Sequence, residues 1–219
     1  MVSFKIASED WEFQEIHRLN YETFVEEIPQ HEKNPTRQLV DKFHNENTYI
    51  ICVNEHALAG MLAVRDKRPF SLDNKLNNLD NYLPGARALC ELRLLAIRKK
   101  YRKKRFIQGL FKYLARYCES NFYDLAIISA STNESGLYRR LGFTEFGPLV
   151  GKNGAMFQPM YLTYDSYGKF KKDSRILNDN DVPEKHFYQP GPVEVRAEVK
   201  EEFARSPVSH RSEEFEKEL

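Results

Sequence analysis

The sequence predicts a single α/β domain in which helices cover both faces of a sheet. Three observations support this fold class. The 219 residues are enough for one such domain with a sizeable core, but not for two equal ones. Hydrophobic residues make up 41% of the chain and charged residues 30%, which is the balance of a folded protein rather than a disordered or fibrous one. Over the first 164 residues, helical and strand periods of apolar side chains alternate.

The N-terminal part predicts two helices and a hairpin. Residues 10–28 have the apolar spacing of an amphipathic helix that can break in two and ends at Pro29. Residues 36–44 predict a second, short helix that buries Leu39, Val40 and Phe43. Two β-branched and aromatic runs, 48–53 and 58–64, flank a polar turn and predict a hairpin. The polar stretch 65–88 predicts an irregular loop with at most one short helix near residues 74–82.

The next part predicts strands that alternate with helices. Residues 89–97 form a strand whose side chains divide between two faces, with Glu91 and Arg93 on one and Cys90, Leu92 and Leu94 on the other. Residues 106–118 predict a helix, and the apolar run 124–130 predicts a strand buried on both faces. A short helix over 134–141 stops at Gly142, and residues 143–150 and 155–164 predict the last pair of strands.

Charge and composition exclude several classes of partner. The 33 Lys and Arg nearly cancel the 32 Asp and Glu, so no global field favours nucleic acid, and we expect no nucleic-acid partner. No run approaches a membrane span and the N-terminus lacks the apolar core of a signal peptide, which predicts a cytoplasmic protein. Three cysteines lie in apolar stretches and the six histidines are scattered, so we expect buried thiols and no metal site.

A basic turn is the first candidate for chemistry. Seven of the eight residues 98–105 are Lys or Arg, and they lie between a predicted strand and a predicted helix. Free N–H groups and the positive end of the helix dipole favour a phosphate at such a junction, and basic side chains add charge-assisted contacts. The alternatives are a solvated basic turn and an RNA-binding patch.

The second candidate is the stretch Leu137-Tyr-Arg-Arg-Leu-Gly-Phe143. A helix here ends at Gly142 and turns at once into a strand, which holds Tyr138 near the edge of the sheet. The alternative is a core tyrosine with its hydroxyl at the rim.

Together, these two stretches resemble the GNAT superfamily of N-acetyltransferases and N-acyltransferases, over about residues 4–164. The resemblance implies a GNAT-like mixed, mostly antiparallel sheet with helices on both faces, in which strand 89–97 splays from strand 125–130 to make a cleft for a donor thioester. It also implies direct transfer of an acyl group to the amine of a small molecule, with Tyr138 protonating the leaving thiolate. The residues that it places around the donor pyrophosphate are Ala96, Ile97, Arg102, Lys103, Lys104, Arg105, Phe106 and Ile107.

The donor carrier is open between two possibilities. Arg105 and Ile107 stand where the family usually has small residues, and their side chains would crowd a pyrophosphate. The chain is also similar to the branch of acyl-homoserine-lactone synthases and N-acyl amino acid synthases, on residues 21–27, Val64-Arg65 and Glu91-Leu92-Arg93. Members of that branch commonly take acyl chains from acyl carrier protein. We therefore expect acyl-CoA or acyl carrier protein as donor, and a basic surface suits an acidic carrier.

The resemblance also implies roles around the acceptor. Glu91 would be the general base for the amine, and Phe24, Arg65 and Arg93 would contact the substrate. A bidentate contact from Arg65 could hold a substrate carboxylate. The alternative for Glu91 is a strand carboxylate paired with Arg93 or Arg65.

Beyond residue 168 the composition becomes polar and charged, which predicts a domain over 1–168 and a linker over 169–185. Residues 186–219 resemble the opening of class V aminotransferases of the alanine–glyoxylate or serine–pyruvate kind, on residues 187–195 and 206–215. This resemblance implies a truncated, poorly ordered aminotransferase segment with no pyridoxal phosphate in this chain. The alternative function is then a non-catalytic acyl-thioester sensor of a fused aminotransferase.

Overall fold

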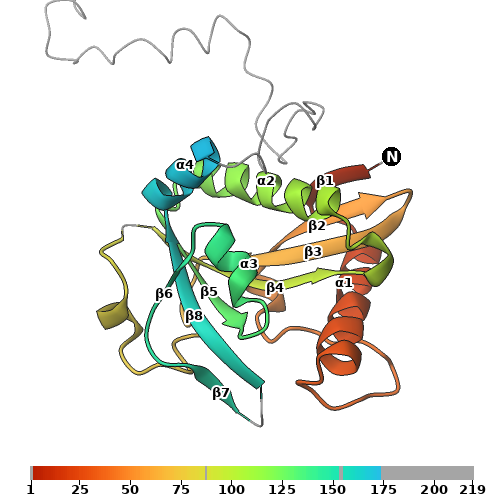
Figure 1. The fold of residues 1–219 in the computed structure, drawn as a ribbon. Coiled ribbons are helices and arrows are strands. Elements are labelled where there is room, and N and C mark those ends of the chain that lie inside the picture. The colour runs from red at the N-terminus through yellow and green to blue at the C-terminus, as the bar shows by residue number, and fades with distance from the viewer. Residues whose placement is uncertain (1, 87, 153–154, 174–219) are drawn as a thin grey trace, which may run out of the picture. The chain divides into compact units, whose positions relative to one another are not determined.

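The computed structural model describes residues 2–86, 88–152 and 155–173 (Figure 1). The predicted aminotransferase segment, residues 186–219, and most of the predicted linker lie outside the described residues. Within the described part, no helix is both long enough and apolar enough to cross a membrane.

Eight strands form one sheet in the order β1-β2-β3-β4-β5-β8-β6, and β7 pairs with β8. Their bounds are β1 Val2–Ile6, β2 Thr48–Asn54, β3 Ala57–Arg65, β4 Leu89–Ile97, β5 Leu125–Ser131, β6 Thr144–Glu145, β7 Val150–Lys152 and β8 Ala155–Thr163. The β4–β5 pair is parallel and the other pairs are antiparallel, which confirms the mixed, mostly antiparallel sheet. The sequence reasoning missed β1, a five-residue edge strand too short for a clear period.

The helices are α1 Asp10–Tyr21, the π-helical η1 Glu22–Glu27, α2 Lys104–Ser120, α3 Ser135–Arg140 and α4 Tyr164–Asp173. The Glu12 carboxylate accepts the backbone N–H groups of Ser8 and Glu9 at 2.8 and 3.1 Å, which fixes the start of α1. The helix predicted over 10–28 does break in two, at residue 22. The domain boundary expected at residue 168 falls inside α4.

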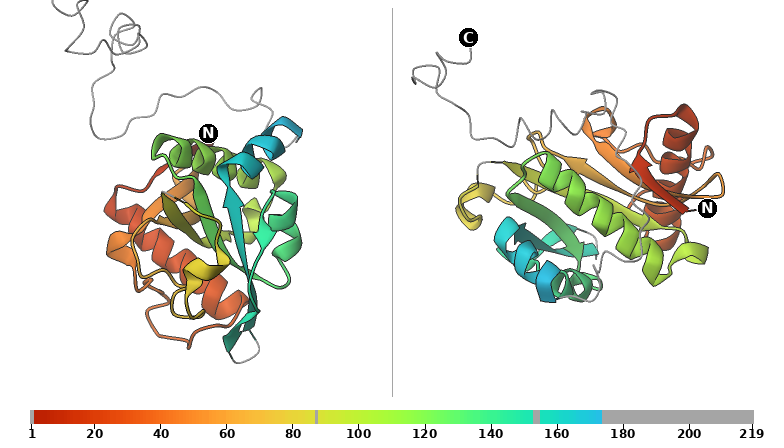
Figure 2. Two further views of the ribbon diagram at one scale, coloured as in Figure 1. Left: turned by 90° about the vertical axis from the view of Figure 1, so that its left-hand side faces the viewer. Right: turned by 90° about the horizontal axis from the view of Figure 1, so that it is seen from above.

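The helices α1 and α2 lie on opposite faces of β2 and β3 (Figure 2). Alternate β2 side chains point to opposite faces. Ile50 therefore packs in the cluster that contains Leu110 and Leu114 of α2, whereas Ile51 packs in the cluster that contains Ile16 and Leu19 of α1. We call these the α2 face and the α1 face of the sheet.

The helix predicted over residues 36–44 is wrong, apart from a 3₁₀ turn at His44–Glu46. Hydrogen bonds from outside the segment replace helical ones: the Leu39 N–H donates to the His17 carbonyl, and the Asn34 amide donates to the Gln38 carbonyl. Val40 is consequently exposed rather than buried, while Phe43 is buried as predicted. The non-helical segment brings residues 41–43 to β4, where they join the site described below.

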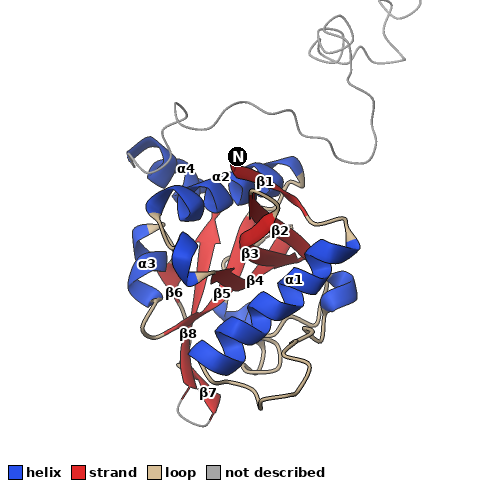
Figure 3. Ribbon diagram, turned by 90° about the vertical axis from the view of Figure 1, so that its right-hand side faces the viewer, coloured by secondary structure: helices blue, strands red, loops and turns tan. Residues whose placement is uncertain are grey.

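Residues 66–88 form an irregular loop, drawn in yellow at the left of Figure 1, and Figure 3, which faces the opposite side, shows α1 in front of the sheet. The helix expected near residues 74–82 is confined to a 3₁₀ turn at Leu79–Tyr82. The loop is held by its own apolar contacts, because Phe70, Leu72 and Leu76 pack in one cluster with Ile127 of β5. It therefore covers part of β5 instead of extending into solvent.

A β-bulge interrupts β4 at Leu94, whose φ is +55°. Ala63 pairs with Arg93 and Met61 pairs with Ala96, so β4 carries one residue more than β3 over this interval. The extra residue turns Leu94 to the α1 face, although the strand pattern predicts that it shares the face of Cys90 and Leu92.

Candidate active site

The two central strands separate in the middle of the sheet. Residues Leu89–Glu91 pair with Leu125–Ile127 and the β4–β5 pairing stops there. β4 then continues beside β3 to Ile97, and β5 continues beside β8 to Ser131. This is the splay that the sequence resemblance implies, and beyond it β4 and β5 are not paired with each other in the described part of the chain.

An apolar groove of about 350 Å³ adjoins the splay on the α2 face. Side chains from β4, β5, α2 and α3 line it, among them Leu92, Ala126, Ile107, Phe111 and Leu137. Lys104 and Gln108, in the first turns of α2, also belong to its wall. A groove with so few polar groups suits an alkyl chain, whose burial there is favourable by the hydrophobic effect.

Tyr138 lies on α3 at the same face. Gly142, with φ of +90°, ends the helix as predicted, and the Tyr138 ring packs edge-on against Phe143 with centroids 5.7 Å apart. Burial raises the pKa of Tyr138 to about 12, and the Glu134 charge adds to this rise. The phenol is therefore protonated at neutral pH and able to donate. Its packing also fits the alternative of a core tyrosine, so its part in proton transfer stays a prediction.

The basic turn is partly neutralised from within the chain. Arg98 contacts Glu15 at 2.8 Å and Glu22 at 3.2 Å, and Arg102 makes two contacts of 2.5 Å with Glu27. The hydrogen bonds from Arg102 lower the pKa of the Glu27 carboxyl. These two arginines hold α1 and η1 against the turn, and whether Arg102 also contacts a donor stays a prediction.

The other residues predicted to bind the donor divide into two groups. Lys103, Lys104 and Arg105 are exposed at the start of α2, close to the groove that Ile107 lines. The side chains of Ala96, Ile97 and Phe106 are buried in the core, so these residues would offer a donor only their backbone.

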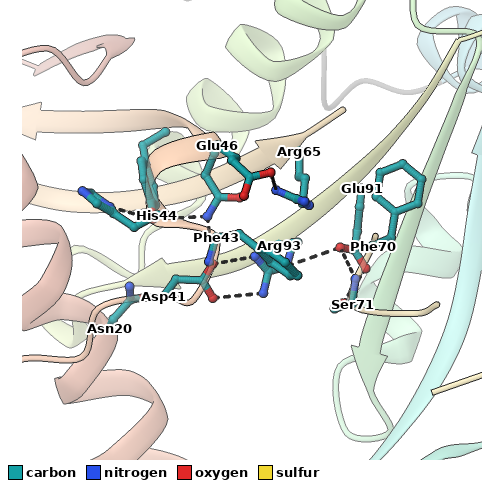
Figure 4. Close-up of polar contacts among 12 residues, drawn as sticks. Asn20, Asp41, Phe43, His44, Glu46, Arg65, Phe70, Ser71, Glu91 and Arg93 are labelled. Carbon is teal, nitrogen blue, oxygen red and sulfur yellow. Dashed lines mark hydrogen bonds and ion pairs between the residues drawn. The ribbon is translucent and has the colours of Figure 1, made fainter. Parts of the chain in front are cut away.

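On the α1 face, next to the splay, five residues form a charged cluster: Asp41, Glu46, Arg65, Glu91 and Arg93 (Figure 4). Arg93 donates two hydrogen bonds to Asp41, of 2.7 and 3.0 Å, and its Nε lies 3.4 Å from Glu91. Of the two arginines considered for pairing with Glu91, Arg93 is the one in contact.

Glu91 is completely buried and its carboxylate is well satisfied. It accepts the backbone N–H groups of Ser71 and Leu72 at 2.8 and 3.2 Å, and the Ser71 hydroxyl also donates to it. A general base in this position would have to exchange one of these donors for the substrate amine. The proposed proton transfer to Glu91 stays a prediction.

Arg65 is 1% exposed and has other partners than a substrate. Its Nε donates to the Pro69 carbonyl at 3.0 Å, Glu46 lies 2.7 Å away, and its guanidinium stacks 3.8 Å from the Phe43 ring centroid. Its role in binding a carboxylate stays a prediction. Phe24 is half-buried and packs against the cluster that also contacts Leu94, on the same face.

Sequence reasoning missed Asp41, Phe43 and Ser71. Burial opposes the ionisation of Asp41, but the hydrogen bonds and charge of Arg93 outweigh it and lower the pKa of the carboxyl. Asp41 and Phe43 lie in the segment predicted as a helix and Ser71 in the loop. No spacing in the sequence marks them, because their importance comes from contacts with β4.

Cys52 and Cys90 are buried as predicted, and Cys118 is half-buried. Across residues 2–86, 88–152 and 155–173, no group of three or more His, Cys, Asp or Glu side chains could hold a metal ion.

The family model described as the N-acyl amino acid synthase FeeM matches residues 15–164. No curated protein matches the chain.

Several solved structures share its fold at low identity. The CoA-dependent acyl-homoserine lactone synthase BjaI, with SAM and isopentyl-CoA, has a TM-score of 0.66 at 14% identity, covering 80% of this chain and 90% of that one. FeeM, an N-acyl amino acid synthase from uncultured soil microbes, has a TM-score of 0.57 at 17% identity, and the match covers 81% of this chain and 97% of FeeM. An acyl-CoA N-acyltransferase from Pseudomonas aeruginosa has a TM-score of 0.53 at 14% identity, and the match covers 74% of this chain and 99% of that one.

The structural matches establish the GNAT-like fold, and the family match extends over well more than half of the chain, including the splay, the groove and the charged cluster. The chain belongs to the FeeM family of N-acyl amino acid synthases and is an N-acyltransferase.

Proposed function

We propose that this N-acyltransferase moves an acyl group from a thioester donor to the α-amine of an amino acid. The observation that carries the proposal is the position of the splay between β4 and β5, with an apolar groove on the α2 face and a charged cluster on the α1 face. An acyl chain and a polar acceptor can thus approach the same opening from opposite faces of the sheet.

The reaction needs no covalent enzyme intermediate when both substrates are held together. The acceptor nitrogen attacks the thioester carbon, so the C–N bond forms and the C–S bond breaks. The nitrogen loses a proton, for which we propose Glu91, directly or through a water molecule. The leaving thiolate gains a proton, for which we propose Tyr138, because its phenol is protonated at neutral pH and lies on α3, whose Leu137 lines the groove.

The donor is acyl-CoA or acyl-loaded carrier protein. Support for the carrier comes from Lys103, Lys104 and Arg105, which are exposed where α2 begins and whose charges suit an acidic protein. By the family resemblance, Arg105 takes a position that is usually a small residue, and its side chain would crowd a pyrophosphate there. Both donors belong to the cytoplasm, where we place the reaction.

The test is turnover by the full chain. The protein is incubated with dodecanoyl-CoA and, separately, with dodecanoyl carrier protein across a panel of amino acids and simple amines, while thiol release and product mass are measured. We expect N-dodecanoyl amino acids to form together with free thiol. Donor binding without transfer to any amine would contradict the proposal and favour a sensor of acyl thioesters.

A further inference from the structure

An amino acid acceptor carries a carboxylate next to the amine that reacts. That carboxylate needs a cation close to the splay, since burial without a partner is costly. The two guanidinium groups of the charged cluster are already engaged by carboxylates. Arg93 is paired with Asp41 and Glu91, and Arg65 with Glu46. The cation for the acceptor has to come from elsewhere.

Lys75 contacts β5, the strand that leaves β4 at the splay, whereas Arg93 lies on β4. It belongs to the loop 66–88, four residues after Ser71, which binds Glu91. Its Nζ donates to the Ser129 hydroxyl at 3.1 Å and lies 4.8 Å from the Phe157 ring centroid. Ser129 is on β5 beyond the last residue paired with β4, so Lys75 stands on the β5 side of the opening.

The distance along β5 from the end of the β4–β5 pairing to Ser129 is short enough for Lys75 to reach an acceptor bound in the opening. Ser129 is two residues beyond Ile127, where the pairing with β4 ends, which corresponds to about 7 Å along the strand. The amine and the carboxylate of an α-amino acid are attached to the same carbon. An amine placed in the opening therefore brings its carboxylate within reach of a flexible lysine at Ser129.

Within the part of the chain that the structure describes, the Lys75 ammonium has partners but no carboxylate counter-ion. Among the described residues, no carboxylate oxygen lies within 4 Å of the Lys75 Nζ. Its contacts are the Ser129 hydroxyl and the Phe157 ring. Burial lowers its pKa, the charge of Glu91 partly offsets this, and Arg93 and Lys42 lower it further. The side chain keeps an exposed surface, so a ligand can reach it. The aromatic ring restricts the ammonium without neutralising it.

We propose that Lys75, oriented by Ser129 and Phe157, binds the carboxylate of the amino acid acceptor. This assignment rests on the proposed function and gives Lys75 the part that the sequence reasoning gave to Arg65. It makes the enzyme selective for amines that carry an α-carboxylate.

The test compares pairs of acceptors that differ only in the carboxylate, such as phenylalanine and phenethylamine, or the amino acid preferred in the panel and its decarboxylated amine. Lys75→Met should raise KM for the amino acid about 10- to 100-fold, the loss expected for a charge-assisted contact, and leave KM for the amine within about threefold. Lys75→Arg should recover most of the affinity. The matched control is Lys67→Met, which removes the same charge from an exposed lysine of the same loop; its KM values should stay within about threefold.

Equal losses for both members of a pair, or the loss appearing in Lys67→Met instead, would overturn the assignment. Equal KM values of the wild-type protein for amino acid and amine would overturn it too, while leaving the proposed function intact. If the wild-type protein acylates no amine, the proposed function fails. Calorimetric titration with the amino acid then still decides the role of Lys75, because binding should be lost in Lys75→Met and retained in Lys67→Met.

Discussion

Arg93 and Asp41, 52 residues apart in the chain, are joined by two hydrogen bonds of 2.7 and 3.0 Å. Both side chains are about nine-tenths buried. The pair holds the segment before β2 against β4, next to the point where β4 leaves β5. Asn47 also donates to Asp41, at 2.9 Å, so the carboxylate has several donors around it.

Removing the charge of Asp41 should therefore destabilise the domain. Asp41→Asn keeps the shape but leaves the Arg93 guanidinium without its main partner, and we expect a loss of about 2–4 kcal/mol in the free energy of unfolding at pH 7. Urea denaturation measures it. Asp10→Asn, at an exposed aspartate in the first turn of α1, is the control and should change the free energy by less than about 1 kcal/mol.

The effect of Asp41→Asn should depend on pH in one direction. The pKa of Asp41 is lowered in the folded protein, so its contribution is fully present above the unfolded value near 3.8 and is lost as pH falls through the folded value. The difference between wild type and variant should consequently be constant between pH 6 and 8 and shrink below about pH 4. A difference that grows as the pH falls would contradict the assignment of the ion pair.

Replacement by alanine should have opposite effects on stability at two glycines, Gly109 and Gly136. A Cβ on Gly109 of α2 would lie 1.9 Å from the Phe4 ring, so Gly109→Ala forces Phe4 away and should cost about 1–3 kcal/mol. A Cβ on Gly136 of α3 meets nothing within 4 Å, and Gly136→Ala should stabilise the protein by up to about 1 kcal/mol. Thermal unfolding of both variants checks this; a stabilised Gly109→Ala would mean that β1 does not pack on α2 as described.

The sequence was sufficient for the elements that carry a strong local period. The hairpin of β2 and β3 and the helix α2, with Leu110 and Leu114 on its buried side, were predicted close to their bounds. The splay of β4 from β5 followed from the family resemblance.

The predictions that were wrong concern parts of the fold that depend on contacts between residues far apart in the sequence. The non-helical course of residues 36–43 is fixed by His17, and the bulge at Leu94 by the register of β4 on β3. For the same reason, the resemblance named Glu91 and Arg93 as site residues but could not supply Asp41 or Ser71, which reach β4 from irregular segments.

Tyr138→Phe should lower the rate of acyl transfer about ten- to a thousand-fold and leave donor affinity nearly unchanged, because only the proton donor is removed. Single-turnover kinetics together with a donor titration separate the two quantities. Tyr82→Phe, at a tyrosine that packs on Phe146 in the loop region, is the control and should have the wild-type rate. An unaffected rate in Tyr138→Phe would leave Tyr138 as a packing residue only.

The basic start of α2 should favour a carrier protein over free CoA. We expect the wild-type chain to bind acyl carrier protein more tightly than CoA. The double variant Lys103→Glu/Lys104→Glu should weaken the carrier interaction about tenfold or more at low salt. Fluorescence titrations with both ligands measure this, with Lys67→Glu as a control at an exposed lysine of the 66–88 loop. Tight CoA binding without detectable carrier binding would contradict this choice of donor.

The central claim, that acyl transfer occurs where β4 leaves β5 with the acyl chain in the apolar groove, is tested most directly by photo-crosslinking. A dodecanoyl donor with a diazirine at the end of its chain, supplied on CoA and on a carrier protein, is irradiated with the full chain, and the labelled peptides are identified by mass spectrometry. We predict labels in α2 between residues 107 and 118 and in the β5 or α3 residues that line the groove. Labels in α1 or in the loop 66–88, with none in α2, would place the acyl chain on the opposite face and contradict the account.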